Sequence, residues 1–235
     1  MSKPCRDAVL TLRHVLNNNE YPRVAQIGVG VGATTLAMAK MMRNRGELHI
    51  FDYVETVTEL TRDLKNKGIQ NIRPHGHSRK TLDSYNWSLA PLLLDIKSRK
   101  AKAFDFVFLK GEHNFPTDGL AVALCIRMLK SGGYILIDDL NWTYDSSRTM
   151  HPAKNLQVSQ RFTTKQTATQ QLRLVCELFL DDSQMFTHET FDGSINSDRV
   201  LFRKIPPPRH TNSALSGIKA TWALLSNFRR RDYGS

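Results

Sequence analysis

The chain has 235 residues, of which 40% are hydrophobic and 23% are charged, and its formal net charge at pH 7 is +11. This length suits one sizeable α/β domain, and the composition is ordinary for a soluble globular protein. The sequence contains no apolar run of the roughly 18 residues that a transmembrane helix needs, and its N-terminus lacks the apolar segment of a signal peptide. The cysteines, Cys5, Cys125 and Cys176, are few and widely spaced. These features predict a cytoplasmic protein with free thiols.

The excess of basic residues indicates a polyanionic partner such as nucleic acid, or an anionic membrane surface. Part of this excess lies near the C-terminus, in Arg209, Lys219 and residues 229–231, which oppose only Asp232. A basic tail is also commonly a solvated end with no partner. Residues 206–235 are therefore predicted to be a flexible or peripheral basic tail, with an amphipathic helical pattern at 218–228.

Helical and strand patterns alternate through the first 140 residues. Helical patterns cover residues 7–16, 34–42, 56–67, 89–98 and 120–129. Strand patterns cover residues 23–29, 47–54, 71–75, 104–109 and 134–140. Gly68 is expected to end the third helix, and residues 132–133 to form a turn. Strands separated by helices predict βαβ units and a parallel sheet that is covered on both faces.

The pattern changes after residue 140. Residues 166–180 predict one long helix, and two strand-like runs follow at 185–191 and 200–204. The turn-rich residues 192–194 between these runs favour an antiparallel pair at the end of the sheet. Three prolines at 206–208 then end the domain, which is predicted to span residues 1–205.

A glycine-rich motif connects the first strand to the following helix. The segment RVAQIGVGVGATTL places Gly28, Gly30 and Gly32 between these elements. Glycines permit a positive φ and a close approach of ligand to backbone, and a helix N-terminus offers free N–H groups. A tight turn without a ligand would use the same residues. The position after the first strand favours a binding site, since ligands of open α/β sheets bind at the carboxyl ends of the strands.

The second strand ends in Asp52, about twenty residues beyond the glycines, where a carboxylate can accept hydrogen bonds from both hydroxyls of a ribose. Glu55 is a nearby alternative. A dinucleotide site usually has the spacing Gly-x-Gly-x-x-Gly, and the run from Gly30 lacks its final glycine. This departure favours S-adenosylmethionine (SAM) over a dinucleotide.

Five segments occur in a specific order: VAQIGVGVGATTL, IFDYVE, GHSRKTL, FDFVFLKGEHNF and LKSGGYILIDDLNW. In order and spacing they resemble the motifs of class I SAM-dependent methyltransferases over residues 20–205. The resemblance is closest to the branch of catechol-, caffeoyl-CoA- and macrocin-type O-methyltransferases. It implies a Rossmann-like, doubly wound seven-stranded sheet, mostly parallel, with an antiparallel C-terminal hairpin.

The resemblance also implies where the cofactor binds. Gly28, Gly30 and Gly32 would line the methionine and ribose part of SAM, and Asp52 would hold the ribose hydroxyls.

Two positions near the expected cofactor depart from the family pattern. Residues 76–78 match a Gly-Asp-Ser that borders the adenine, so His77 and Ser78 are expected there, with His77 in place of the acid. Gln26 stands where the family usually has Glu or Asp. Both changes remove negative charge, although an amide and an imidazole can still form hydrogen bonds.

The end of the fourth strand departs further. The family commonly has Asp-Gly-Asp-His there, and this chain has Lys110, Gly111, Glu112 and His113. In metal-dependent members the first Asp binds Mg²⁺ together with an acidic pair after the fifth strand, which is residues 138–139 here. Lys110 supplies a positive charge where a hard cation would need an oxygen ligand. A divalent metal is therefore disfavoured.

Several roles stay open for these residues. Lys110 is expected to pair with Asp138 or Asp139 and to orient a substrate hydroxyl in place of the metal, to act as a general base with a lowered pKa, or only to neutralise the acidic pair. Glu112, His113, Asp138 and Asp139 are the metal ligands if a metal does bind. His113 is expected to take the substrate proton, or only to cap the next helix.

The sequence thus predicts an O-methyltransferase that acts on a small hydroxylated acceptor. Two alternatives remain. One is a nucleic-acid methyltransferase that uses the basic surface. The other is a degenerate methyltransferase fold that binds without catalysis, because Gln26, His77 and Lys110 depart from the family pattern.

Overall fold

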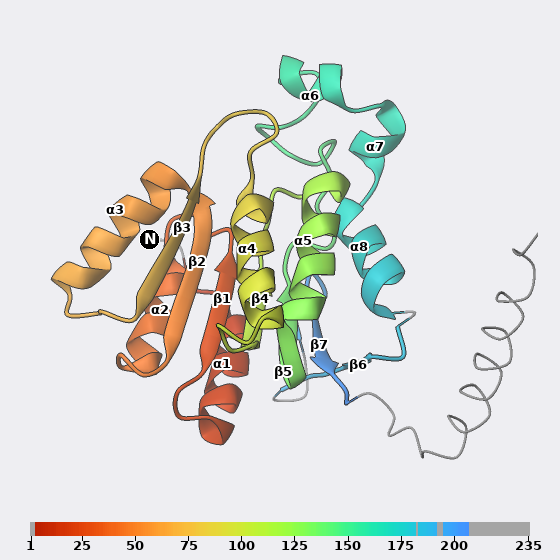
Figure 1. The fold of residues 1–235 in the computed structure, drawn as a ribbon. Helices are drawn as coiled ribbons and strands as arrows, with labels where there is room; N and C mark the ends of the chain where they lie inside the picture. The colour runs from red at the N-terminus through yellow and green to blue at the C-terminus, as the bar shows by residue number, and fades with distance from the viewer. Residues whose placement is uncertain (1–2, 182, 192–194, 207–235) are drawn as a thin grey trace, which may run out of the picture. The chain divides into compact units, whose positions relative to one another are not determined.

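The computed structural model describes residues 3–181, 183–191 and 195–206. One sheet contains seven strands in the order β3-β2-β1-β4-β5-β7-β6 (Figure 1). Strands β1 to β5 are parallel, whereas β7 runs antiparallel to both β5 and β6. The predicted fold class, a doubly wound seven-stranded sheet with an antiparallel C-terminal pair, is confirmed.

The strands are β1 (Arg23–Ile27), β2 (Glu47–Tyr53), β3 (Ile72–His77), β4 (Phe104–Leu109), β5 (Leu129–Ile137), β6 (Phe186–His188) and β7 (Val200–Lys204). The α-helices are α1 (Arg6–Asn18), α2 (Ala33–Met42), α3 (Val54–Asn66), α4 (Tyr85–Lys97), α5 (Phe115–Met128), α6 (Leu156–Arg161), α7 (Thr164–Ala168) and α8 (Gln171–Cys176), and a π-helical turn, η1 (Glu177–Asp181), follows. None of the described helices is long and apolar enough to span a membrane.

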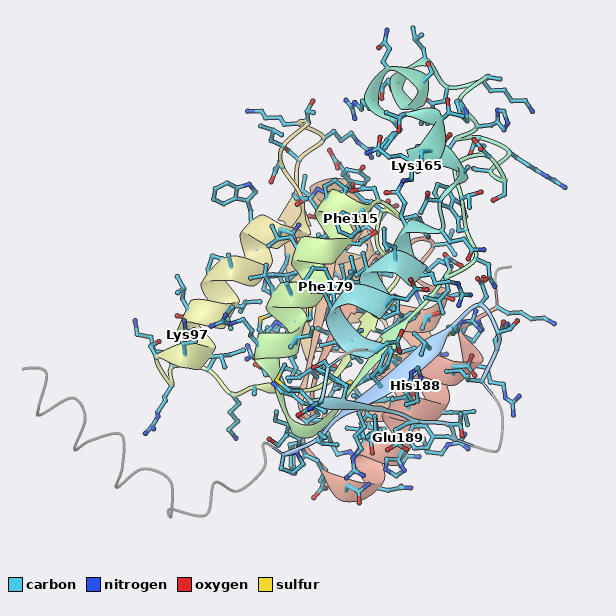
Figure 2. The ribbon with its side chains drawn as sticks, turned by 90° about the vertical axis from the view of Figure 1, so that its right-hand side faces the viewer. Lys97, Phe115, Lys165, Phe179, His188 and Glu189 are labelled. Carbon is cyan, nitrogen blue, oxygen red and sulfur yellow. The ribbon has the colours of Figure 1, made fainter. Side chains whose placement is uncertain are left out.

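Helices cover both faces of the sheet, and each face has its own core. One core joins the strands to α1, α2 and α3, and the other joins them to α4, α5 and α8. Phe115 and Phe179, which Figure 2 labels, pack against the second core. All six residues of β4 are buried, so its continuous apolar sequence is that of a strand covered on both sides.

The sequence predicted several element ends correctly. Gly68 follows α3 with φ +78°, and the N–H of Ile69 donates to the carbonyl of Leu64, as in a glycine-terminated helix. Helices α4 and α5, by contrast, begin earlier than the predicted residues 89 and 120, after Ser84 and Asn114, whose side chains accept hydrogen bonds from backbone N–H groups of their first turns. Both of these caps set the start of a helix at the carboxyl edge of the sheet.

The prediction of one long helix over residues 166–180 is wrong. The chain leaves the helical conformation at Thr169 and Gln170, which separate α7 from α8. Buried Gln171 explains the break, because its amide N–H donates to the carbonyl of Gln166 at 2.8 Å while its oxygen accepts from the N–H of Phe115 at 2.7 Å. A tertiary contact with the start of α5 therefore outweighs the local helical pattern.

Two further expectations need correction. Gly132 and Gly133 form no separate turn, because β5 begins at Leu129 and contains both glycines, next to a shift in its register with β4. Helix α6 was not predicted, and its exposed Leu156 and polar neighbours explain why no periodic pattern marked it. The predicted boundary at residue 205 stays a prediction, and the basic tail and the residue 218–228 pattern lie outside the described residues.

Two histidines, one on β2 and one on β3, lie next to each other in the sheet. His49 Nδ1 is 2.9 Å from His75 Nε2 on the neighbouring strand, and the Arg23 Nε–H donates to His49 Nε2 at 3.2 Å. Burial, followed by the charge of Arg23, lowers the pKa of each imidazole to about 4. Both rings are therefore neutral in the folded protein at neutral pH.

This pair predicts that the fold loses stability in mild acid. The unfolded chain binds protons at the ordinary histidine pKa, and the folded chain does so only near pH 4, so the free energy of unfolding falls as the pH drops between these values. After allowance for partial exposure, we expect a fall of roughly 2 kcal/mol between pH 7 and pH 5 in urea unfolding. The His49→Gln variant should lose about half of this dependence, whereas a variant of exposed His188 should keep it. An equal pH dependence in all three proteins would contradict the assignment.

Candidate functional site

The glycine loop lies between β1 and α2, and each of its three glycines has a positive φ. A Cβ atom at Gly28 would lie 2.1 Å from the carbonyl oxygen of Lys110, and one at Gly32 would lie 2.7 Å from a methyl group of Leu60. A Cβ at Gly30 would meet no atom within 4 Å. Gly28 is therefore required by packing against backbone. Gly32 is favoured by its φ of +77°, since the end of the Leu60 side chain could move, and Gly30 faces open space.

Two polar side chains hold this loop in shape. Asp52, at the end of β2, accepts hydrogen bonds from the N–H groups of Val29 at 2.8 Å and Gly30 at 3.3 Å. Gln26 is buried in β1, where its amide donates to the carbonyl of Gly28 and its oxygen accepts from the hydroxyl of Thr35. The amide of Gln26 thus donates to the loop backbone, which a carboxylate could not do.

The residues after β3 form a second part of this edge. His77 is buried, and its ring packs between those of Tyr53 and Tyr85 at 4.7 and 5.9 Å. Ser78 donates from both its backbone N–H and its hydroxyl to the Asp83 carboxylate, each at 2.7 Å. These hydrogen bonds lower the pKa of Asp83. A carboxylate is therefore present beside Ser78, although the sequence analysis expected none there.

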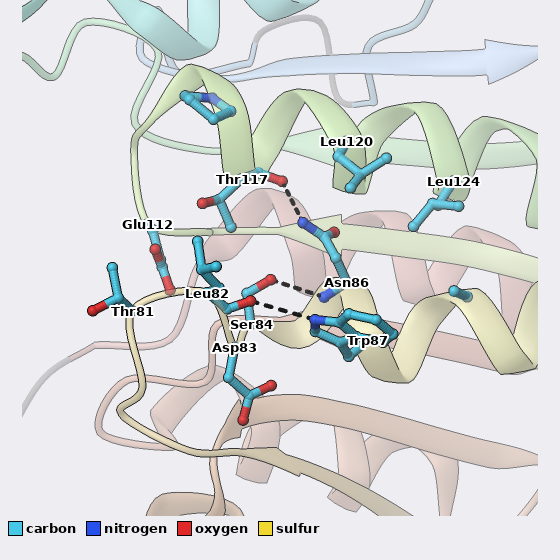
Figure 3. Close-up of a pocket in the computed structure, with 12 residues that line it drawn as sticks. Thr81, Leu82, Asp83, Ser84, Asn86, Trp87, Glu112, Thr117, Leu120 and Leu124 are labelled. Atoms are coloured by element: carbon cyan, nitrogen blue, oxygen red, sulfur yellow. Dashed lines mark hydrogen bonds between the residues drawn. The ribbon is translucent and has the colours of Figure 1, made fainter.

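A pocket of about 500 Å³ opens next to Asp83, between the beginnings of α4 and α5 (Figure 3). Its walls are apolar where Leu82, Trp87 and Leu120 line it, and Glu112 supplies a second carboxylate. Sequence reasoning did not single out this pocket, because its walls come from residues 81–90 and 112–124, which only the fold brings together.

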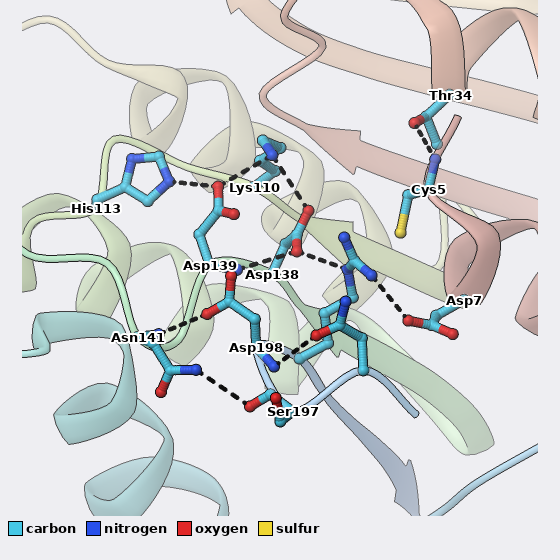
Figure 4. A network of polar contacts seen from close by, with 12 residues as sticks. Cys5, Asp7, Thr34, Lys110, His113, Asp138, Asp139, Asn141, Ser197 and Asp198 are labelled. Atoms are coloured by element: carbon cyan, nitrogen blue, oxygen red, sulfur yellow. Dashed lines mark hydrogen bonds and ion pairs between the residues drawn. The ribbon is translucent and has the colours of Figure 1, made fainter. Parts of the chain in front are cut away.

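Lys110 lies between the two carboxylates that follow β5 (Figure 4). Its Nζ is 3.0 Å from Asp139 Oδ2 and 3.3 Å from Asp138 Oδ2. Burial alone would lower the pKa of Lys110, but the two carboxylates outweigh it, and the pKa is raised. The alternative in which a lowered pKa makes Lys110 a general base is therefore wrong, because the side chain stays an ammonium.

Asp138 is paired with a second cation that the sequence analysis did not identify. Its side chain is almost completely buried, and its Oδ1 is 2.6 Å from Arg199 Nε. Arg199 also contacts Asp7 of α1 at 3.0 Å. Arg199 lies just before β7, so neither spacing nor motif connected it to the site.

His113 and Asp139 form a second pair in the cluster, and about a fifth of each side chain is exposed. His113 Nε2 is 2.8 Å from Asp139 Oδ2. Burial opposes the charge of Asp139, but His113 and Lys110 lower its pKa to about 2. Both residues have φ near +60°, a strained conformation that is common at functional sites. The ring of Trp142 packs on His113, with centroids 4.7 Å apart.

A buried carboxylate shapes the loop that carries His113. Asp118 in α5 accepts hydrogen bonds from the N–H groups of Glu112 and Asn114 and from the hydroxyl of Tyr85. Burial raises the pKa of Asp118 to about 6. Asp118 therefore fixes the conformation of this loop, and it also connects the loop to Tyr85 of α4.

The same contacts bear on metal binding. Both oxygens of Asp138 and the Oδ2 of Asp139 already face cations or the His113 ring, and the described residues contain no group of three or more His, Cys, Asp or Glu side chains placed to hold a metal ion. Two fixed positive charges beside the acidic pair would repel a divalent cation. The donor set therefore does not fit a metal.

The chain resembles a known family in sequence and known structures in fold. Residues 25–140 match a family model described as a methyltransferase domain. No curated protein matches the chain by sequence.

Several solved structures share the fold. The O-methyltransferase TomG of Streptomyces achromogenes, in complex with SAM, is 15% identical, with 84% of this chain and 79% of that chain covered and a TM-score of 0.54. The SAH-bound methyltransferase PaMTH1 of Podospora anserina is 14% identical, with 83% and 76% covered and a TM-score of 0.53. An rRNA methylase of Streptococcus thermophilus is 14% identical, with 88% and 99% covered and a TM-score of 0.50.

The fold, the glycine loop and the family match define the class of protein. Residues 25–140 match the methyltransferase domain family, and this match together with the fold identifies a SAM-dependent methyltransferase of class I.

The Lys110 arrangement yields a prediction about metals. In the Lys110→Asp variant, three carboxylates would meet with only Arg199 left to neutralise them, so Mg²⁺ should raise its Tm by several degrees through binding to the folded state. The Tm of the natural protein should not change with Mg²⁺ or EDTA. Thermal unfolding of both proteins checks this, and stabilisation of the natural protein by Mg²⁺ would show that a metal site exists despite Lys110.

Proposed function

We propose that this chain transfers the methyl group of SAM to a hydroxyl group of a small acceptor. The observation that carries the proposal is the direct contact between the two halves of the site: Gly28 of the glycine loop packs against the carbonyl of Lys110, and Lys110 pairs with both Asp138 and Asp139. A cofactor on the loop would therefore lie next to the polar cluster. The sequence resemblance to O-methyltransferases supports a small hydroxylated acceptor.

The cofactor would be held by the loop and the ends of β2 and β3. Gly30 leaves room for it, and the Asp52 carboxylate is available for the ribose hydroxyls at the same edge. Ser78 would border the adenine, with Asp83 beside it. Because His77 is buried, it would act by packing under this surface.

When bound, SAM supplies a methyl group on a sulfonium centre, so the protein mainly has to position the acceptor and remove its proton. His113 fits the second task. Asp139 accepts from Nε2 of the neutral imidazole, which leaves Nδ1 as the proton acceptor. After the transfer, the Asp139 carboxylate would stabilise the imidazolium ion.

Lys110 fits the first task. Its ammonium is held by two carboxylates yet remains about half exposed, so it can donate a hydrogen bond to the acceptor oxygen. A fixed positive charge at this position would stabilise an oxygen that becomes more negative as its proton leaves. Lys110 would thus supply the fixed positive charge that a metal supplies elsewhere.

The glycine loop provides the first test. Gly30→Asp should abolish binding of S-adenosylhomocysteine (SAH), measured by isothermal titration, because its side chain enters the open space of the cofactor region; its positive φ of +52° should lower the Tm moderately, without unfolding the protein. Gly28→Ala should instead lower the stability by about 3 kcal/mol, since its Cβ overlaps a backbone carbonyl. Unchanged SAH affinity in Gly30→Asp would refute the cofactor assignment.

His113 provides the second test. With an acceptor identified by tritiated SAM against a panel of phenols and sugars, His113→Gln should lower kcat by roughly 10²-fold or more. Its Kd for SAH should match that of the natural protein. His188→Gln, a change of an exposed histidine, is the control for both measurements. A His113→Gln enzyme that keeps more than a third of the kcat would show that another group takes the proton.

A further inference from the structure

The segment between β5 and α8 has an unusual charge pattern. From Ser146 to Cys176 it contains five basic residues and no Asp or Glu: Arg148, Lys154, Arg161, Lys165 and Arg173. It carries the short helices α6 and α7, which extend beyond the carboxyl ends of the strands (Figure 1). This basic segment therefore lies at the edge of the sheet that holds the candidate site.

Most of these charges are free to meet a ligand. The side chains of Arg148, Lys154, Arg161 and Lys165 are exposed. Among the residues that the structure describes, no carboxylate forms an ion pair with any of the four. Unpaired basic side chains at one edge produce a positive potential that attracts anions.

A series of contacting aromatic rings joins the basic segment to His113. The ring of His113 packs on Trp142 at 4.7 Å, Trp142 on Tyr144 at 4.7 Å, and Tyr144 on Phe162 at 4.5 Å. Tyr144 is buried, and the N–H of Asp145 donates to the carbonyl of Thr167 at 3.2 Å. The segment is thus anchored beside His113.

Basic residues also lie on the neighbouring loop. Arg79 and Lys80 follow β3, and this connection also extends past the strand ends (Figure 1). The guanidinium of Arg79 lies over the ring of Tyr53, 4.1 Å from its centroid, so it is held at this edge. Asp83 is the carboxylate nearest to Arg79 and Lys80 in the sequence, and it accepts a hydrogen bond from the hydroxyl of Ser78.

We infer that the acceptor carries phosphate, and that the basic segment binds this phosphate while His113 and Lys110 act on the acceptor hydroxyl. This inference rests on the proposed function and names its class of substrate. Lys and Arg side chains are the preferred protein partners of phosphate, and several separate cations match a ligand with more than one negative charge. In keeping with the proposed small acceptor, the phosphate belongs to a small molecule such as a sugar phosphate, and RNA is the other source of phosphate that the test distinguishes.

The test compares two double variants with equal losses of charge. Lys154→Gln/Lys165→Gln removes two lysines from the basic segment. Lys97→Gln/Lys100→Gln removes two exposed lysines, Lys97 at the end of α4, which lies away from Lys165 (Figure 2), and Lys100 three residues after it. Each full-length protein is saturated with SAH and titrated with ribose 5-phosphate and with a labelled ten-residue oligouridylate. The Kd for SAH is measured in parallel.

We expect at least one probe to bind the natural protein and to bind Lys154→Gln/Lys165→Gln roughly tenfold more weakly, with the control variant within about twofold. Ribose 5-phosphate binding would identify a small phosphate ester. Oligouridylate binding that weakens steeply with added salt would identify RNA. Normal SAH binding without either probe, or equal losses in both variants, would overturn the inference. Absence of SAH binding would instead show that the proposed function has failed.

Discussion

The site depends on one buried carboxylate and the two cations that neutralise it. An unpaired carboxylate in the position of Asp138 would destabilise the fold by several kcal/mol, and Lys110 and Arg199 remove this cost from opposite sides. Arg199 also binds Asp7 of α1. Residues from the beginning, the middle and the end of the domain are thereby tied to the end of β5, and the acidic pair is fixed in position without a metal ion.

The strand order places this cluster next to the glycine loop, and the two together form a candidate active site. Because β4 lies between β1 and β5 in the sheet, Lys110 reaches the acidic pair on one side and touches the glycine loop on the other. A glycine is needed at position 28 for this packing alone. The glycine motif thus has more than one cause, since Gly28 makes room for the backbone of Lys110, Gly32 has a positive φ, and Gly30 faces open space.

Substitutions that suggested a degenerate site have specific structural roles. Gln26 braces the glycine loop through both ends of its amide, and His77 fills the space between two tyrosine rings. Asp83 supplies a carboxylate next to Ser78. Lys110 replaces an acidic residue but keeps the cluster close to charge balance. These departures from the family pattern therefore leave an ordered, fully paired site.

The sequence by itself determined the sheet, the glycine loop and the acidic pair, because alternating buried strands and helices, glycine spacing and strand ends are local signals that the chain order preserves. The resemblance to the family's motifs led us to expect Lys110 beside Asp138 or Asp139, and the sheet agrees, since neighbouring parallel strands end at one edge. Only the tertiary structure decided the rest. Arg199, the break before Gln171 and the ring stack to Phe162 all depend on contacts between distant segments. The raised pKa of Lys110 likewise depends on how burial balances against paired charge, which no sequence motif records.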